Sequence, residues 1–348
     1  MKILAIDLGK SKSVYVDYVT SGGPQTFGKV DTNAHDLEKL LEVQRPDRLV
    51  IEACPAAGWV CDLARRRGLP VQVANGNDER WRWKQVKKKT DRTDAVKLAQ
   101  LSEWESLPQV HVPKPEVRQW RALIEYRQNL VSRRTAMRNS IRAIYERQGL
   151  NLSAAQRAWT KKAVAALQQQ VAAAPAEAVW LLQVGCELQQ MAMVEQQIAV
   201  VEKKLEAVAE TRPEVRRLQG APCVGPRLSE TVVAILDDPH RFKNGRQVGC
   251  YAGLTPRRWQ SGQMDRQGHI SRAGPKRLRA LLVEIAWLGV RHHTWMLEVY
   301  EHVRRGSDKR KKVAIVAVAR RLLVRLWAML RDGTPWQEAT KSASAATG

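Results

Sequence analysis

Paired cysteines are missing from this sequence. The five cysteines, at positions 54, 61, 186, 223 and 250, are an odd number and form no C-x-x-C pair. Structural zinc sites place their thiols at such short spacings, and disulfide frameworks use an even number of cysteines. The pattern argues against both classes and indicates the reduced thiols of a cytosolic protein.

Long apolar runs are also absent, as is the pattern of a secretory signal. A helix needs about 20 consecutive apolar residues to cross a bilayer. The N-terminus starts with Met1 and Lys2 and continues directly into a short apolar strand. We therefore expect neither a membrane span nor a signal peptide.

Acidic residues are few relative to basic ones. Only 35 Asp and Glu stand against 58 Lys and Arg in 348 residues, which leaves a formal charge of +23. An excess of this size favours a polyanionic partner, above all nucleic acid. An anionic membrane surface is the alternative that charge alone leaves open. The length is sufficient for two or three domains.

A basic run leads directly into a pair of carboxylates. Lys87, Lys88 and Lys89 precede Asp91 and Asp94, and apolar residues then follow at helical spacing. Residues three apart share a helix face, so both carboxylates can point at one spot. Close carboxylates repel each other, and a bound divalent cation relieves that repulsion. The pattern suits phosphodiester chemistry, although a solvated first helical turn also favours aspartate.

The first 76 residues are predicted to form an α/β domain. Strands are expected at residues 3–6, 14–18, 27–30, 49–51 and 71–73. One helix follows the third strand, capped by Thr32 or Asn33, and another follows the fourth. The order of three strands, helix, strand, helix and strand, followed by the Asp91 helix, is that of an RNase H-like fold.

Two further carboxylates lie at predicted strand ends. Asp7 follows the first strand and Glu52 follows the fourth, and open α/β sheets bind ligands at the carboxyl ends of their strands. Together with Asp91 and Asp94 they form a set of hard oxygen ligands that selects Mg²⁺ or Mn²⁺. Two such ions can hold the attacking and leaving oxygens of a phosphoryl transfer. Taken singly, Asp7 fits a turn residue and Glu52 a surface charge, but their joint placement favours the metal site.

Cations alternate with tryptophan just upstream of the basic run. In Arg80-Trp81-Arg82-Trp83-Lys84, the cations can contact phosphates and the indoles can stack on unpaired bases. An amphipathic helix that packs both tryptophans inward explains the pattern equally well.

Residues 113–211 are predicted to be helical, with long helices at 117–148 and 179–208. Each long helix carries an apolar residue every seven positions. These residues are Leu123, Leu130, Met137 and Ile144 in the first helix, and Val184, Met191, Ile198 and Leu205 in the second. Such seams are typical of a coiled coil or helical hairpin that self-associates. A helical bundle within one chain is the alternative.

Two candidate phosphate-binding segments lie in residues 212–335. Residues 218–226 resemble a helix-hairpin-helix loop, although Cys223 stands where such loops have their first glycine. Further along, small residues are mixed with cations, among them Lys276 and Arg277, as suits a loop that approaches phosphate. The Ala- and Ser-rich tail, 336–348, is predicted to be disordered.

A serine in the second of these segments is a candidate nucleophile. Ser261 follows Arg257 and Arg258 and precedes Gly262. Neighbouring cations would stabilise its alkoxide and the charge on an attacked phosphate. A Ser-Gly turn is the simpler explanation of the same residues.

Several of these motifs occur together in one order. They are Ile-Asp7-Leu-Gly, Ile-Glu52-Ala, Lys-Thr-Asp91-Arg-Thr-Asp94-Ala, Tyr-Ala-Gly-Leu-Thr-Pro-Arg-Arg and Arg-Ala-Gly-Pro-Lys-Arg-Leu-Arg. In this order they resemble the DEDD-type insertion-sequence transposases of the IS-one-ten group, the RNA-guided bridge recombinases. The resemblance covers residues 1 to about 335.

The resemblance implies a RuvC-like domain at 1–112, a coiled-coil region at 113–211 and a mostly α-helical transposase domain at 212–335. It implies that Asp7, Glu52, Asp91 and Asp94 bind Mg²⁺, or Mn²⁺, and that Ser261 bonds covalently to DNA. The implied partners are donor and target duplex DNA, a structured non-coding guide RNA, and further copies of the chain, as a dimer or a tetramer on DNA. The implied location is the nucleoid of a prokaryotic cytoplasm.

Two other classes of function fit the residues. A RuvC-like nuclease would use the same four carboxylates to hydrolyse DNA with water, and Ser261 would then be only a turn residue. A non-catalytic nucleic-acid-binding protein fits the charge but leaves the carboxylates without a use. A covalent protein–DNA adduct separates the transposase from the nuclease.

Overall fold

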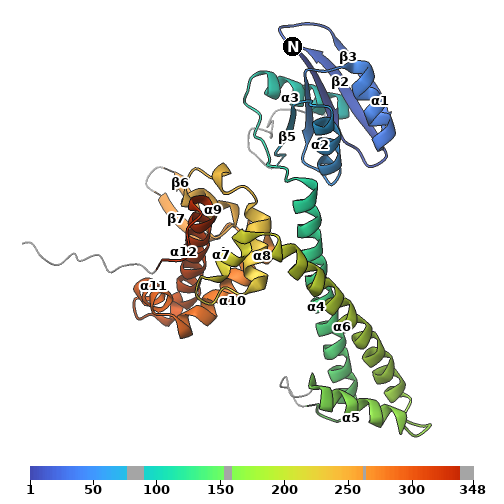
Figure 1. The fold of residues 1–348 in the computed structure, drawn as a ribbon, viewed down its shortest axis with the longest axis vertical. Coiled ribbons are helices and arrows are strands. Elements are labelled where there is room, and N and C mark those ends of the chain that lie inside the picture. The colour runs from blue at the N-terminus through green and yellow to red at the C-terminus, as the bar shows by residue number, and fades with distance from the viewer. Residues whose placement is uncertain (77–89, 153–158, 262–263, 338–348) are drawn as a thin grey trace, which may run out of the picture. The chain divides into compact units, whose positions relative to one another are not determined.

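The computed structural model describes residues 1–76, 90–152, 159–261 and 264–337 (Figure 1). The chain forms two compact units, Met1–Arg118 and Gln119–Gly348. Each unit has hydrophobic clusters of its own. Within the described ranges, no helix combines the length and the apolar character that a bilayer crossing requires.

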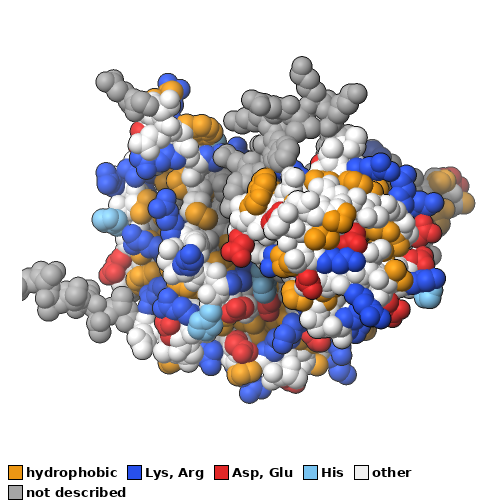
Figure 2. Space-filling model, turned by 90° about the horizontal axis from the view of Figure 1, so that it is seen from above, with side chains coloured by type: hydrophobic (Ala, Val, Ile, Leu, Met, Phe, Trp, Pro, Cys, Tyr) orange, Lys and Arg blue, Asp and Glu red, His pale blue; other side chains and the backbone are white. Residues whose placement is uncertain are grey.

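The basic excess of the sequence is visible on the surface. Lys and Arg side chains are spread over the face that Figure 2 shows, with fewer Asp and Glu among them. A surface of this kind attracts polyanions over a distance of about 10 Å at moderate salt.

A five-stranded sheet forms the centre of the first unit. Its strands are β1 (Lys2–Asp7), β2 (Lys12–Val19), β3 (Gln25–Asp31), β4 (Arg48–Glu52) and β5 (Val71–Ala74), in the spatial order β3-β2-β1-β4-β5. β2 is antiparallel to β1 and β3, whereas β4 is parallel to β1 and β5. The predicted strands and their order along the chain are confirmed.

Helices cover both faces of this sheet because side chains alternate along each strand. Leu4 and Ile6 of β1 pack against α1 (Ala34–Gln44) and α2 (Ala57–Arg66). Ile3 and Ala5 pack on the other face against α3 (Asp91–Glu103). This double coverage explains why β1 is a continuous apolar run. Asn33, one of the two predicted caps, accepts a hydrogen bond from the backbone of α1.

Three helices form the first part of the second unit. They are α4 (Pro115–Arg147), which begins in the first unit, α5 (Lys161–Ala172) and α6 (Trp180–Glu210). The first half of α4 lies against the second half of α6, as the ion pair of Arg127 with Glu202 shows. The opposite ends also pair, as Ile144 and Val184 do. α4 and α6 therefore form an antiparallel helical pair.

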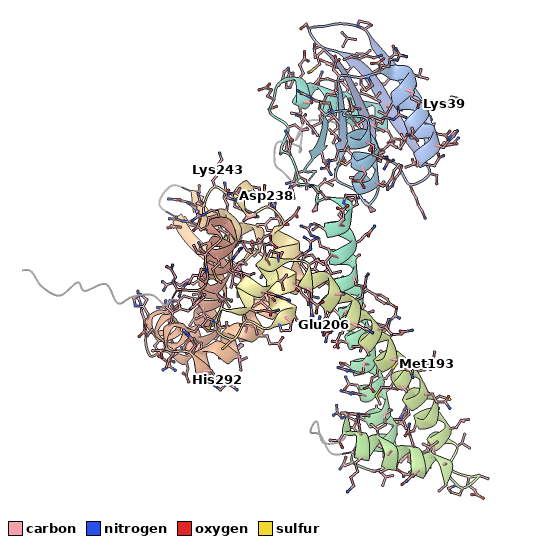
Figure 3. All side chains as sticks on the ribbon, viewed as in Figure 1. Lys39, Met193, Glu206, Asp238, Lys243 and His292 are labelled. Carbon is pink, nitrogen blue, oxygen red and sulfur yellow. The ribbon has the colours of Figure 1, made fainter. Side chains whose placement is uncertain are left out.

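Within this chain the heptad seam lies between α4 and α6, as the alternative of a helical bundle within one chain predicts. Met191 and Ile198 are 2% and 5% exposed, and they are covered by residues of the same chain. Met193, by contrast, is 63% exposed and points outward from α6 (Figure 3). The seven-residue repeat identified the helix–helix contact, and the bundle within one chain fills it.

The rest of the second unit is mostly helical, as predicted. Its elements are α7 (Pro213–Gln219), α8 (Pro226–Leu236), η3 (Pro239–Arg241), α9 (Gly245–Tyr251), β6 (Pro256–Ser261), β7 (Met264–Ile270), α10 (Lys276–His292), α11 (Thr294–Arg304), η4 (Asp308–Arg310) and α12 (Lys311–Asp332). α12 is the central helix, and its contacts with α9, α10 and α11 bury Val318, Leu322 and Leu326.

Two details of the C-terminal part differ from expectation. Residues 256–261 and 264–270, in the stretch of small residues and cations that was expected to form a loop, are the paired strands of the antiparallel β6–β7 hairpin. Every residue of β6 is exposed, so the strand carries no alternation of apolar residues that would announce it. Trp336, placed in the predicted tail, packs edge-on against Trp295 at 5.6 Å between ring centres. Residues 338–348 of that tail lie outside the described part.

Candidate active site

Two of the predicted metal ligands lie side by side at one edge of the sheet. β1 and β4 are parallel neighbours, with Ile6 opposite Ile51. Asp7 and Glu52 are the last residues of these strands. Both carboxylates therefore project at the carboxyl edge, where open α/β sheets bind their ligands.

The direction of α3 brings the other two carboxylates to the same edge. At its C-terminal end, Glu103 accepts a hydrogen bond from the Tyr18 hydroxyl at 2.6 Å. Tyr18 pairs with Ile3, at the beginning of β1. A helix of 13 residues and a strand of 6 residues both span about 20 Å. The first turn of α3, with Asp91 and Asp94, therefore lies at the edge where β1 ends.

Threonines cap this helix, so the aspartates are not needed for that purpose. The Thr90 hydroxyl accepts a hydrogen bond from the Thr93 amide at 3.2 Å, and the Thr93 hydroxyl accepts one from the Thr90 amide at 3.0 Å. This reciprocal capping box satisfies the exposed amides of the first turn. Asp91 is exposed and Asp94 half-buried. A cap is therefore not the reason for two carboxylates at this position.

Gly76 gives the Glu52 carboxylate its space. A Cβ atom added at Gly76 would lie 2.0 Å from Glu52 Oε1. The backbone after β5 thus passes close against the carboxylate, and a side chain at this position would have to displace it. The local sequence gives no sign of this contact, because it depends on how the chain after β5 passes Glu52.

The four carboxylates share an edge without closing on one point. In the part of the chain that is described, no three His, Cys, Asp or Glu side chains converge as metal ligands would. The donor set itself fits a hard divalent ion, because it consists of carboxylate oxygens and has room at Gly76. The structure therefore places the four predicted ligands at one edge of the sheet.

Ser261 belongs to the second unit, at the end of β6. It is exposed and pairs with Met264 across the hairpin. Because side chains alternate along a strand, Ser261 shares a face with Trp259, and Arg258 lies on the other face. Arg258 is paired with Asp265 of β7. Arg257 donates to the Ser271 carbonyl at 3.3 Å.

The other predicted nucleic-acid contacts divide into three groups. Lys276 is exposed at the start of α10. Arg277 is half-buried, and burial lowers the pKa of its guanidinium, so it is partly withdrawn from solvent. The remaining six, Arg80, Arg82, Lys84, Lys87, Lys88 and Lys89, lie outside the described residues.

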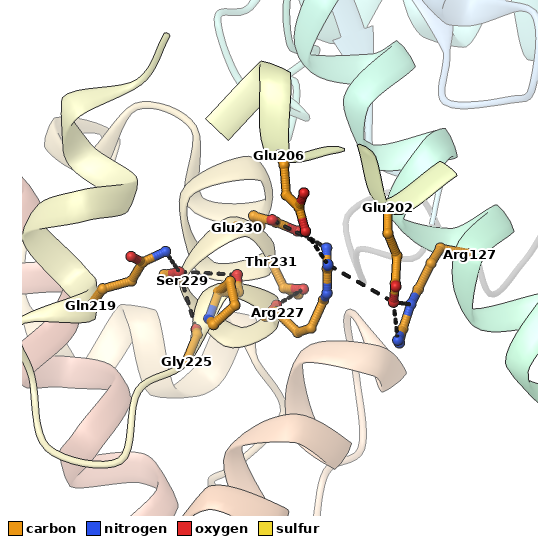
Figure 4. Close-up of polar contacts among 10 residues, drawn as sticks. Arg127, Glu202, Glu206, Gln219, Gly225, Arg227, Ser229, Glu230 and Thr231 are labelled. Carbon is orange, nitrogen blue, oxygen red and sulfur yellow. Dashed lines mark hydrogen bonds and ion pairs between the residues drawn. The ribbon is translucent and has the colours of Figure 1, made fainter. Parts of the chain in front are cut away.

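An ion cluster with one buried carboxylate ties α4, α6 and α8 together (Figure 4). Arg227 of α8 lies 3.1 Å from Glu230, 3.6 Å from Glu206 and 3.8 Å from Glu202. Arg127 of α4 donates to Glu202 at 2.9 Å. Glu230 is only 1% exposed, and burial raises the pKa of its carboxyl group. Sequence reasoning missed this cluster because its members lie far apart along the chain.

Comparison with known proteins gives the family. A DEDD model of IS110 enzymes, described as "Transposase", matches residues 4–147, and the "Transposase IS116/IS110/IS902 family" model matches residues 215–301. The two matches include all four carboxylates and Ser261. The chain belongs to the IS110 family of DEDD transposases. The predicted resemblance is thereby confirmed, and this transposase is a DNA-processing enzyme.

Relatives agree with the two models. The transposase is 28% identical over 291 residues to the "Transposase for insertion sequence element IS1111A" of Coxiella burnetii, which covers 81% of this chain and 77% of the relative. It is 28% identical over 367 residues to the "Putative transposase y4rJ" of Sinorhizobium fredii, at 95% and 92% coverage. A "Pilin gene-inverting protein" of Moraxella lacunata is 27% identical over 118 residues, at 34% and 37% coverage. The DEDD domain implies an RNase H-like fold and dependence on a divalent metal.

Proposed function

We propose that this transposase cuts and joins DNA through a covalent bond between Ser261 and a DNA phosphate. Asp7, Glu52, Asp91 and Asp94 would hold the divalent ion, Mg²⁺ or Mn²⁺. The observation that carries the proposal is the placement of all four carboxylates at one edge of the sheet. When bound there, the ion supplies positive charge to the phosphoryl oxygens.

The serine step is a transesterification. The Ser261 hydroxyl gives up its proton to solvent and forms an Oγ–P bond, while one P–O bond to the sugar breaks and the sugar oxygen takes up a proton. One phosphodiester replaces another, so the reverse step can join the phosphate to a different DNA end without an external energy source. The exposed position of Ser261 at the end of β6 supports this role, because the hydroxyl can meet a large substrate.

The proposed partners follow from the proposed transposase function. We infer that donor and target duplex DNA are the substrates, and that a structured guide RNA from the element selects them. Assembly of several copies on DNA, at the nucleoid of a prokaryotic cytoplasm, belongs to the same proposal. The net charge of +23 supports binding of such polyanions.

A RuvC-like nuclease is the second candidate. The carboxylates belong to the first unit and Ser261 to the second. In this alternative, the metal bound by the carboxylates would cleave DNA without any contribution from Ser261. Water then replaces the serine hydroxyl and the DNA is released without a protein bond.

The deciding experiment traps the reaction on labelled DNA under denaturing conditions. Ser261→Ala should bind DNA normally but give no adduct and no recombination. Ser271→Ala is the matched control, because Ser271 lies near Arg257 in the same unit. An adduct that maps to a residue other than Ser261 would refute the serine assignment. Normal cleavage by Ser261→Ala would favour the nuclease.

A further inference from the structure

An open groove in the second unit has no part in the chemistry described so far. It has a volume of about 1100 Å³ and lies between α12, α9 and strand β7. We call it the α12 groove. Six cationic side chains line it: Arg246, Arg272, Lys312, Arg320, Arg321 and Arg325. None of the described residues that line it is an Asp or a Glu.

Most of these cations have no internal partner. Across the described ranges, the side chains of Arg246, Arg272, Lys312, Arg320 and Arg321 make no ion pair or hydrogen bond within the protein. This contrasts with the Arg227 cluster, where each guanidinium faces carboxylates. Their charges are therefore directed at something outside the chain.

The arrangement also carries an electrostatic cost. α12 begins with Lys311, which pairs with Asp308, and Lys312, and it has no acidic residue in its first turn. Cations at this positive end of a helix are unfavourable. Arg321 and Arg325 lie four residues apart, where like charges on a helix repel. A bound polyanion would remove both costs.

The floor of the groove is apolar. It is formed by Leu254, Val313, Val316, Ala317 and Val324. Val313 is exposed, and Val316, Ala317 and Val324 are half-exposed. Phosphates do not cover apolar surface, but the faces of bases do. Duplex DNA keeps its bases stacked inside, whereas an unpaired strand offers both phosphates and base faces.

The position of the groove beside the hairpin favours DNA over RNA as the strand. Gly268, His269 and Ile270 of β7 form one wall. β7 pairs with β6, which ends at Ser261. We propose that the α12 groove holds an unpaired DNA strand next to the hairpin that carries Ser261. This inference rests on the proposed function, because DNA is there the substrate of Ser261.

The test measures binding in the Ser261→Ala background, with divalent metal withheld so that neither the serine reaction nor metal-dependent hydrolysis can cut the DNA. The groove variant is Lys312→Gln with Arg321→Gln, and both residues are exposed. The matched control is Lys203→Gln with Lys204→Gln, two exposed lysines on α6. Both pairs remove the same charge. Fluorescence anisotropy with an oligothymidine, at salt from about 50 to 200 mM, gives the salt dependence of affinity.

The slope of log affinity against log salt concentration should become shallower by about 1.4 when two phosphate contacts are lost. Each phosphate contact with a single strand contributes about 0.7 to this slope. The control pair should keep the full slope. An unchanged slope in the groove variant overturns the proposal. The proposal is also overturned if the groove variant loses more affinity for duplex DNA, or for unpaired RNA, than it loses for unpaired DNA.

The experiment distinguishes a wrong assignment of the α12 groove from a wrong assignment of Ser261 as nucleophile. Binding is measured in the Ser261→Ala background, so an adduct that maps to another residue leaves these slopes untouched. Circular dichroism and thermal melting report folding. The groove variant should melt no lower than its control, because it removes repulsion from α12.

Discussion

Arg258 on β6 forms a two-point ion pair with Asp265 on β7. Nε donates to Oδ1 at 2.7 Å and Nη2 donates to Oδ2 at 2.6 Å. The pair holds the pKa of Asp265 below its usual value, so the carboxylate stays charged at neutral pH. Arg258 is therefore neutralised within the hairpin, although the sequence predicted it as a phosphate contact.

Asp265→Asn should convert Arg258 into such a contact. The amide carries no charge, so the guanidinium becomes available to DNA. We expect tighter duplex binding and a salt slope that is steeper by about 0.9. The control is Asp332→Asn, because Asp332 pairs in the same two-point manner with Arg331 at the end of α12. Equal gains in both variants would assign the effect to net charge alone.

Gly76→Ala should impair the carboxylate edge as Glu52→Ala does. The added methyl group would lie 2.0 Å from Glu52 Oε1 and must displace it. Changes next to metal ligands typically reduce metal affinity or activity by about 10- to 100-fold. Manganese binding, measured by electron paramagnetic resonance, should fall together with recombination. Gly225→Ala is the control, since a Cβ there meets nothing within 4 Å. Wild-type manganese affinity in Gly76→Ala would remove Glu52 from the proposed ligands.

Charges in the α4–α6 seam should destabilise the chain. Met191→Asp and Ile198→Asp each place a carboxylate in a buried site, which should lower the free energy of unfolding by about 3 kcal/mol or more. Met193→Asp and Val200→Asp lie on the same helix at 63% and 70% exposure, and they should change it by less than about 0.5 kcal/mol. Urea denaturation provides the comparison. If light scattering instead shows a smaller mass and urea shows no loss of stability, the seam joins two chains.

Glu230 should give the second unit a pH-dependent stability. Its pKa is raised above the ordinary 4.5 because the side chain is buried, so the folded state binds this proton more tightly than the unfolded state. The resulting stability is fully present below pH 4.5 and is lost as the pH rises through the folded pKa. Glu230→Gln abolishes this titration. Relative to the variant, the wild type should lose stability between pH 4.5 and neutrality. Glu206→Gln, an exposed neighbour of Arg227, is the control, and parallel pH curves for Glu230→Gln and the wild type would refute the assignment.

The strands and helices of the first unit could be predicted because burial leaves a pattern in sequence. Ile3 to Ile6 are continuous apolar residues since both faces of β1 are covered. The β6–β7 hairpin leaves no such pattern, because β6 is exposed throughout. Its strands are joined by Arg258 and Asp265, and by the ring of Trp259 against Gly268. Such contacts cannot be predicted from the sequence of either strand alone, because they depend on which residues face each other across the hairpin.

The carboxylates at the sheet edge were also predictable, since strand ends and the first turn of a helix can be located from local patterns. The role of Gly76 was not, because it depends on how closely the chain after β5 passes Glu52. The helix that packs against the heptad seam could not be predicted from the sequence either. A repeat of seven identifies a helix that needs a neighbour, but an α4 in the same chain and one in another chain have the same sequence.

The α4–α6 pair constrains how the length of this region can change during evolution. Deleting one residue from a helix turns everything beyond it by about 100° and moves its apolar stripe off the partner. Deleting seven residues from each helix returns the stripes almost to their starting direction and shortens the pair by about 10 Å. Relatives with shorter or longer helical pairs should therefore differ in whole heptads, so that the distance from α5 to the β6–β7 hairpin varies in fixed steps.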